Sequence, residues 1–203
     1  MSFGKLKRAL QGIINRKDLT DELAGDFINR AIDEVERVCR LGSMEALLEA
    51  TNWDGSRNTI AIPTGFLEII DLFTDDGVLH QVTKDQFFNH RNDGKPAVFI
   101  KAGASYLVKP YPQPGTTLRL HYYAETQPLL ADLDENVWTR SGFNAVLYGA
   151  AALAADYFQM EDVYAQRFQS KAEGYVEAIL AQDIAEKWAG QTQVGPVQHA
   201  GQF

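Results

Sequence analysis

Apolar residues near the start of the chain recur at the three- and four-residue spacing of a helix. Phe3, Leu6, Leu10 and Ile13 would share one face of a short helix, and the charged residues around them are basic. We therefore predict a basic amphipathic arm over residues 1–17. Such a helix can either pack on its own domain or offer its basic side to a partner, and the pattern leaves both open.

The next helical pattern begins after Thr20, a residue type favoured as an N-cap, which two acidic residues follow in the first turn. This helix continues to about Arg40. Its apolar face is formed by Leu23, Phe27, Ala31, Val35 and Val38. Gly42 and Ser43 interrupt the pattern, and we predict a further short helix over 44–50.

The periodicity changes from Thr59 onward. Short runs rich in β-branched and aromatic residues alternate with turn residues, which is typical of strands. These runs lie at 60–62, 66–73, 78–82, 97–101, 106–109 and 118–123. Gly77 and Gly103 separate neighbouring runs and suit tight turns. We predict an antiparallel meander, with one or two helical turns capped by Thr83 between its strands.

Helical patterning returns after Pro128. Residues 143–158 carry apolar side chains on more than one face and are rich in Ala, so this helix needs neighbours on several sides, neighbouring subunits included. A second helix is predicted over 160–188, where about 29 residues at 1.5 Å each give roughly 43 Å. Residues 189–203 hold three Gly, one Pro, four Gln and no Lys, Arg, Asp or Glu, which predicts a flexible tail.

Together the patterns predict an α+β fold, in which a helical bundle carries an inserted antiparallel β domain. The bundle takes residues 18–58 and 127–188 and ends in a long helical hairpin. The β domain takes residues 59–126. The basic arm at 1–17 and the tail at 189–203 flank them.

Charge is placed unevenly along the chain. Of the 19 Lys and Arg, five lie in residues 1–17, which hold no acid, and the remaining 14 stand against 27 Asp and Glu. An acidic body repels phosphates, so general nucleic acid binding is disfavoured. No apolar run approaches the roughly 20 residues of a membrane-spanning helix, and the N-terminus does not read as a secretory signal.

Residues that could carry chemistry are sparse. The single cysteine, Cys39, lies at the end of an apolar helix face, which favours a buried, unreactive thiol in a reducing compartment. Asp132, Asp134 and Glu135 form an acidic loop, but it lacks the Gly and the later Glu of a calcium-binding loop, so a solvated helix cap is favoured. The histidines form no ligand-like pair: they are His80, His90, His121 and His199. No catalytic, cofactor or metal site is predicted.

The order of the elements resembles the head-to-tail adaptor, or connector, proteins of short-tailed and related tailed bacteriophages. The stretches that carry the resemblance are Leu19-Thr20-Asp21-Glu22, residues 62–68, 82–87, 107–112 and 120–124, Asn136, Trp138, Thr139-Arg140, Leu147-Tyr148-Gly149-Ala150, and the long helix with Tyr164, Phe168 and Tyr175. Their order spans most of residues 19–190. Many relatives begin the penultimate helix with a His-Pro-Asp-like start, whereas this chain has Ser141-Gly142-Phe143. The arm and the tail fall outside the resemblance.

This resemblance implies a structural virion protein with no enzymatic role and no cofactor. It implies a ring, expected to hold twelve copies, between the portal protein and the tail nozzle protein, through which DNA passes without specific binding. Assembly in the host cytoplasm and a place in the neck of the virion are further implications. An acidic lining suits a channel that DNA must traverse.

For the contact with the portal or a neighbouring copy, we predict the C-terminal helix and the tail. Tyr175, Trp188 and Phe203 are the expected anchors, because aromatic side chains dominate interface energies. Trp188 ends an apolar stripe and could instead cap the core of its own bundle. The alternative function is a peripheral binding module, whose basic N-terminal helix docks to nucleic acid or an anionic surface.

Overall fold

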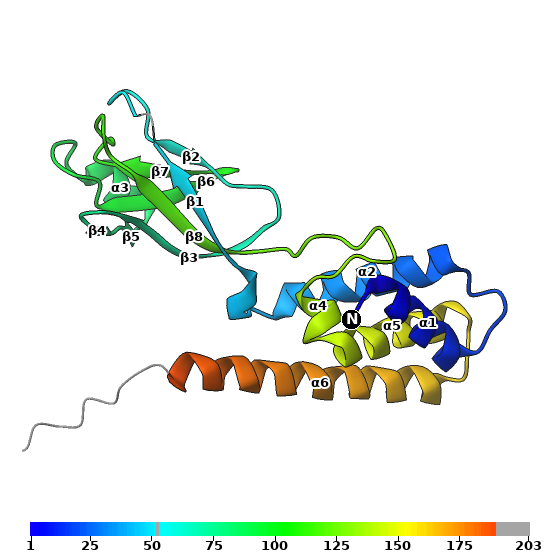
Figure 1. Ribbon diagram of the computed structural model, residues 1–203. Helices are drawn as coiled ribbons and strands as arrows, with labels where there is room; N and C mark the ends of the chain where they lie inside the picture. The colour runs from blue at the N-terminus through cyan, green and yellow to red at the C-terminus, as the bar shows by residue number, and fades with distance from the viewer. Residues whose placement is uncertain (52, 190–203) are drawn as a thin grey trace, which may run out of the picture. The chain divides into compact units, whose positions relative to one another are not determined.

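The computed structural model describes residues 1–51 and 53–189 (Figure 1). The chain forms two compact units. One contains Met1–Gly42 and the described residues from Pro128 onward, and the other contains Ser43–Gln127. The first unit is helical and the second is built around β-sheets, so the α+β fold class predicted from the sequence is confirmed.

Five α-helices make up the described part of the helical unit. They are α1 (Phe3–Ile14), α2 (Asp21–Val38), α4 (Val137–Arg140), α5 (Phe143–Tyr157) and α6 (Asp162–Ala189). Helix α5 packs against the other four, and α6 runs alongside it (Figure 1). Eight residues of α5 are buried and six of these are alanines, which allow close approach of the neighbouring helices. The neighbours expected for this Ala-rich helix are thus provided by its own chain.

Helix α1 is a packed part of the helical unit. Its buried residues are Phe3, Gly4, Leu6, Leu10 and Ile14. Ile13, predicted on the apolar face, is half-buried. The first N–H groups of a helix lack partners within it, and here those of Phe3 and Gly4 donate to the carbonyls of Asp134 at 3.0 Å and Asp132 at 2.9 Å. The loop before α4 therefore holds the start of α1.

Helix α2 begins as the sequence predicts. The Thr20 hydroxyl accepts a hydrogen bond from the Leu23 N–H at 3.2 Å, which satisfies one of the free donors of the first turn. Phe27 and Ala31 are buried as expected. Val38 is not, since 73% of it is exposed at the last position of the helix.

Helix α6 has 28 residues and starts at Asp162, two residues later than predicted. Ala172 is its one buried residue. The tail predicted at 189–203 lies outside the described residues, apart from Ala189, which ends α6.

The β unit contains two four-stranded sheets. Its strands are β1 (Glu45–Ala50), β2 (Thr59–Ala61), β3 (Phe66–Thr74), β4 (Gly77–Val78), β5 (His80–Gln81), β6 (Val98–Ala102), β7 (Ser105–Lys109) and β8 (Leu118–Ala124). The strand orders are β1-β8-β3-β4 and β2-β7-β6-β5, and all neighbours are antiparallel except β5 and β6. The predicted meander is therefore wrong in detail, because β8 inserts between β1 and β3 and one pair is parallel.

The short helix predicted over 44–50 is also wrong. A 3-10 turn at Gly42–Met44 leads into strand β1, whose residues alternate between exposed and half-buried. Ala46 and Leu48 pack against the core of the β unit, and Leu48 lies opposite Leu120 of β8. Pairing with β8 overrides the helix propensity of Glu, Ala and Leu. Residues 43–58, assigned to the bundle from the sequence, accordingly belong to the β unit.

Apolar side chains from both sheets form the core of the β unit. The core residues are Trp53, Ile60, Leu72, Leu79, Phe99, Tyr106, Val108, Leu118, Leu120 and Tyr122. Helix α3 (Lys84–Asn89) covers a smaller cluster, where its Phe87 packs with Val98 and Ile100. Thr83 caps α3 in a reciprocal capping box with Gln86, so the helical turns predicted here are confirmed.

Candidate interaction surface

Large apolar side chains are exposed along α6. Between 40% and 67% of each is accessible in Val163, Tyr164, Tyr175, Ile184 and Trp188. Scattered apolar residues are ordinary on a protein surface, but five on one helix with a single buried residue are not. The helical unit uses α6 sparingly in its own core, which leaves much of this helix for other contacts.

Trp188 lies in the last turn of α6 with 67% of its surface exposed. Ile184, one helical turn earlier, is 55% exposed. The described part of the helical unit therefore leaves Trp188 exposed and does not cover it as a cap on the core. An indole and a neighbouring aliphatic side chain at a helix end offer a large apolar contact with few rotors to immobilise.

Tyr175 is held in place by ring stacking. Its ring lies parallel to that of Tyr148 on α5, with the centroids 5.8 Å apart and the planes 2° from coplanar. Phe168 stacks on Tyr148 at 6.2 Å, and the Lys171 ammonium lies 4.6 Å from the Tyr148 ring centre. Tyr175 is still 40% exposed, so it presents a fixed aromatic edge.

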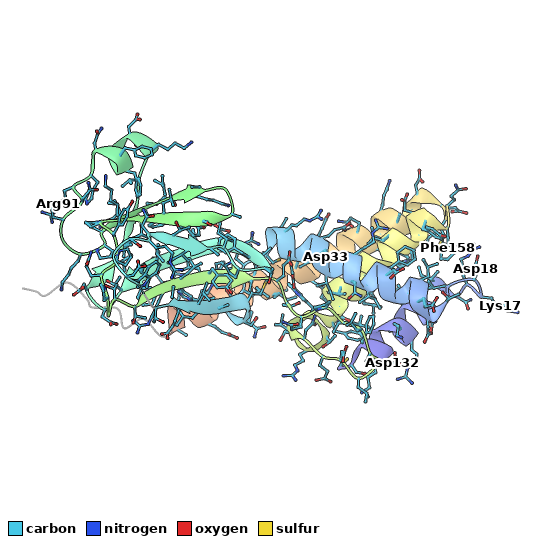
Figure 2. The ribbon with its side chains drawn as sticks, turned by 90° about the horizontal axis from the view of Figure 1, so that it is seen from above. Lys17, Asp18, Asp33, Arg91, Asp132 and Phe158 are labelled. Atoms are coloured by element: carbon cyan, nitrogen blue, oxygen red, sulfur yellow. The ribbon has the colours of Figure 1, made fainter. Side chains whose placement is uncertain are left out.

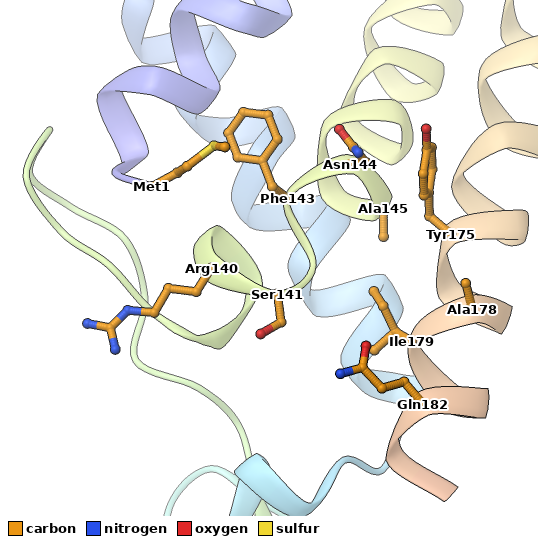
Figure 3. A pocket seen from close by; sticks show the side chains of 10 residues that line it. All are labelled: Met1, Arg140, Ser141, Phe143, Asn144, Ala145, Tyr175, Ala178, Ile179 and Gln182. Carbon is orange, nitrogen blue, oxygen red and sulfur yellow. The ribbon is translucent and has the colours of Figure 1, made fainter. Parts of the chain in front are cut away.

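Tyr175 also lines a shallow hollow of about 360 Å³. In Figure 3, Tyr175 and Ile179 of α6 lie across from the segment that joins α4 to α5. The other lining residues are Met1, Arg140, Ser141, Phe143, Asn144, Ala145, Ala178 and Gln182. Of the three anchors predicted from the sequence, Tyr175 and Trp188 are thus both on α6 and both exposed, and Phe203 lies outside the described residues.

A second hollow, which we call the α2–α6 groove, runs between these two helices over α5. It measures about 380 Å³ and is lined by Ala31, Glu34, Val35, Val38, Gly149, Gln169, Ala172, Glu173, Val176 and Glu177. Its floor is apolar, and three carboxylates lie at its rim. Val38, which is exposed and does not pack in the core of its own unit, lines this groove.

The acidic loop is solvent-exposed, as predicted, but the cap of α4 is Asn136, and the loop's own side chains make defined contacts. Asp132, labelled in Figure 2, forms an ion pair with Lys7, with Nζ of Lys7 2.5 Å from Oδ1 of Asp132. The hydrogen bond to Asp132 raises the pKa of Lys7. The Asp134 carboxylate accepts the N–H groups of Ala131 at 2.7 Å and Leu130 at 2.8 Å, which lowers its pKa. These bonds brace the loop that holds the start of α1.

Glu135 completes the loop. Its carboxylate accepts a hydrogen bond from Nε of Arg140 at 3.2 Å. This bond and the nearby N-terminal ammonium lower the pKa of Glu135. In the described residues no group of three or more His, Cys, Asp and Glu is placed to hold a metal ion. The loop acts as a brace between α1 and α4.

Cys39 and three of the four histidines lie in the part of the chain that the structure describes, and His199 lies outside it. Cys39 is 1% exposed and burial raises its thiol pKa, as expected for an unreactive cysteine. His121 Nε2 lies 3.1 Å from a carboxylate oxygen of Glu45, His80 is exposed and His90 is half-buried at the end of α3. None of the helices in the described ranges is both long and apolar enough to cross a membrane.

Comparison with known families now assigns this architecture. The family model of the SU10 adaptor protein matches residues 1–196. The chain belongs to the SU10 adaptor family. The adaptor is thus a structural protein of a bacteriophage, as the resemblance in its sequence indicated. The comparison with curated proteins gave no match.

The family match also corrects one expectation. The resemblance was drawn over residues 19–190, with the basic arm outside it, whereas the family model includes the arm from residue 1. The buried face of α1 gives the physical reason, because this helix is part of the packed unit.

Sequence reasoning missed the α2–α6 groove of the adaptor. Val38 was predicted on the apolar face of its helix, and its place at the end of that face was the available signal. A pattern within one helix does not show that α2 and α6 stand apart over Gly149 of α5.

Proposed function

We propose that the adaptor forms a ring of twelve copies between the portal protein and the tail nozzle protein, and that this ring is part of the conduit for DNA. Its membership of an adaptor family supports a place among the neck proteins of the virion. A ring also gives the exposed apolar residues of α6 somewhere to be buried.

The observation that carries this proposal is the exposure of Trp188 and Ile184 at the end of α6. A soluble monomer gains nothing from leaving an indole two-thirds exposed beside an isoleucine. Burial of apolar surface stabilises by about 25 cal/mol per Å², so a partner that covers this helix end gains substantially. The stacked Tyr175 offers a second, preorganised contact on the same helix.

The charge of the adaptor supports the conduit. Outside residues 1–17, 27 acidic residues outnumber 14 basic ones. A channel with an acidic wall does not hold the phosphates of DNA, so it lets the duplex slide. No enzymatic step is part of this function.

The alternative, a peripheral module that docks through its basic N-terminal helix, has weaker support. An interfacial helix must present an apolar face to the membrane, and in α1 that face is buried against the helical unit. Lys7 is engaged with Asp132 and Asp21. The exposed cations of α1 alone are a small patch on an acidic protein.

The test uses two variants, Trp188→Ala and a chain lacking residues 189–203. Each is mixed with purified portal rings, and attachment is measured by co-sedimentation while the melting temperature of the free chain is followed. We expect both variants to lose attachment at least tenfold and to melt within about 2 °C of the parent. Phe88→Ala, an exposed aromatic on α3 of the β unit, is the matched control and should attach normally.

Normal attachment of both variants would show that the contact lies on another surface. A Trp188→Ala chain that melts several degrees lower and still attaches would assign Trp188 to stability and contradict its role as an anchor.

A further inference from the structure

The α2–α6 groove combines an apolar floor with an acidic rim. Its rim carboxylates belong to Glu34, Glu173 and Glu177, and none of its lining residues is Lys or Arg. Glu173 accepts a hydrogen bond from Gln169 at 2.9 Å. Within the described ranges, no cation is paired with Glu34 or Glu177. A partner would match this groove if its cations could reach the carboxylates at the rim and if a slim, weakly polar surface beside those cations could cover the apolar floor.

The exposed side of α1 has those properties. Lys5 and Arg8 are exposed and lie one turn apart, and Gly12 follows one turn later. A side chain added at Gly12 would meet no atom within 4 Å, so the helix backbone is open there to close approach. The Arg8 guanidinium donates to the Gly4 carbonyl of its own helix, and in the described part of the chain it pairs with no carboxylate.

Two surfaces of one helical unit are therefore complementary in charge, and Gly12 leaves one of them open to close approach. The residues after Ala189 are a poorer match, because residues 190–203 contain no Lys or Arg to meet the carboxylates. A contact between two different surfaces of identical chains is heterologous, and when its rotation closes it generates a ring.

We propose that the α2–α6 groove of one adaptor receives the Lys5, Arg8 and Gly12 face of α1 from a second copy. This inference rests on the proposed ring, for which it supplies the contact between neighbours. Each copy contributes its groove on one side and its α1 face on the other. The contact excludes water over Val38 and Val176 while Lys5 and Arg8 reach the rim carboxylates.

Charge reversal tests this contact in the full-length chain. Lys5→Glu/Arg8→Glu and Glu173→Lys/Glu177→Lys should each weaken self-assembly at least tenfold, measured by light scattering with and without portal rings. A chain that carries both pairs of changes should recover assembly. Lys84→Glu/Arg91→Glu, on the β unit, is the matched control and should assemble as the parent does. Melting temperatures establish that every variant is folded.

Disulfide trapping tests the same contact by position. In a Cys39→Ala background, chains with Gly12→Cys are mixed with chains with Val176→Cys, so that only a contact between copies can join them. A covalent dimer is expected. Ala181→Cys in place of Val176→Cys puts the thiol on an exposed position of α6 that does not line the groove, and it should give little dimer.

The outcomes separate this inference from the proposed function. If the parent chain forms rings while charge reversal leaves them intact and no dimer is trapped, the groove contact is wrong and the ring stands. If the reversed chains form rings but no longer attach to portal, the groove receives a basic segment of the portal, and the proposed occupant is wrong. If the parent never self-associates, with or without portal, both the ring and the contact are overturned.

Discussion

The indole of Trp138 donates a hydrogen bond to the carboxylate of Glu36 across 102 residues of sequence, with Nε1 2.5 Å from Oε1. Trp138 is fully buried and Glu36 is 2% exposed. The bond joins α4 to α2. It therefore connects the two chain segments of the helical unit, one before and one after the β unit in the sequence. A buried carboxylate is costly when its hydrogen bonds are missing, so this partner matters for stability.

Replacement of Trp138 by Phe should destabilise the adaptor by about 1–3 kcal/mol, because Glu36 loses a donor in a site that water does not reach. Chemical denaturation followed by circular dichroism measures the change. Trp188→Phe is the control, since that side chain is exposed, and should stay within about 0.5 kcal/mol of the parent. Equal stabilities for the two variants would contradict the role of the Glu36 contact.

Gly142 leaves room for the same tryptophan. A Cβ at Gly142 would lie 2.5 Å from Cε3 of Trp138, inside van der Waals contact. We expect Gly142→Ala to cost about 1–3 kcal/mol through overpacking. Gly174→Ala is the matched comparison, because it lies within α6 with no atom within 4 Å of its added Cβ, and it should stabilise by up to about 1 kcal/mol. A neutral Gly142→Ala would show that Trp138 can shift freely.

Acid should weaken the brace between α1 and α4. Hydrogen bonds from Ala131 and Leu130 lower the pKa of Asp134, and Arg140 lowers that of Glu135. Unfolded Asp and Glu titrate near about 3.9 and 4.3. Because the folded pKa values lie lower, this stabilisation is present above about pH 4 and is lost as pH falls through them.

The melting temperature of the parent should therefore decline below about pH 4, and Asp134→Asn should show a shallower decline from a lower starting value. Asp26→Asn, at an exposed position within α2, controls for the change in net charge and should follow the parent. An Asp134→Asn profile parallel to that of the parent would show that Asp134 does not contribute to this acid sensitivity.

Several helices could be predicted from local pattern alone. Thr20 in the helical unit and Thr83 in the β unit cap helices as expected, and the long α6 lies within two residues of its predicted bounds. These features depend on residues three or four apart, which a single stretch of sequence contains. The arm was harder, since the choice between a packed and a free helix depended on the carbonyls of Asp132 and Asp134 far along the chain.

The failures share one physical cause, the action of distant partners. Residues 45–50 favour a helix by composition, and only pairing with β8, about 70 residues later, makes them strand β1. Val38 was read as core because its period matches that of Phe27 and Ala31, yet it borders the α2–α6 groove.

We propose that this adaptor works as a ring on the portal. Native mass spectrometry of portal rings saturated with the 22.6 kDa chain counts the copies bound per ring. We expect twelve copies per portal ring, bound together over a narrow concentration range. Two results would contradict the ring: adaptor copies that bind one at a time and do not stop at twelve, or a chain that stays monomeric beside intact portal rings.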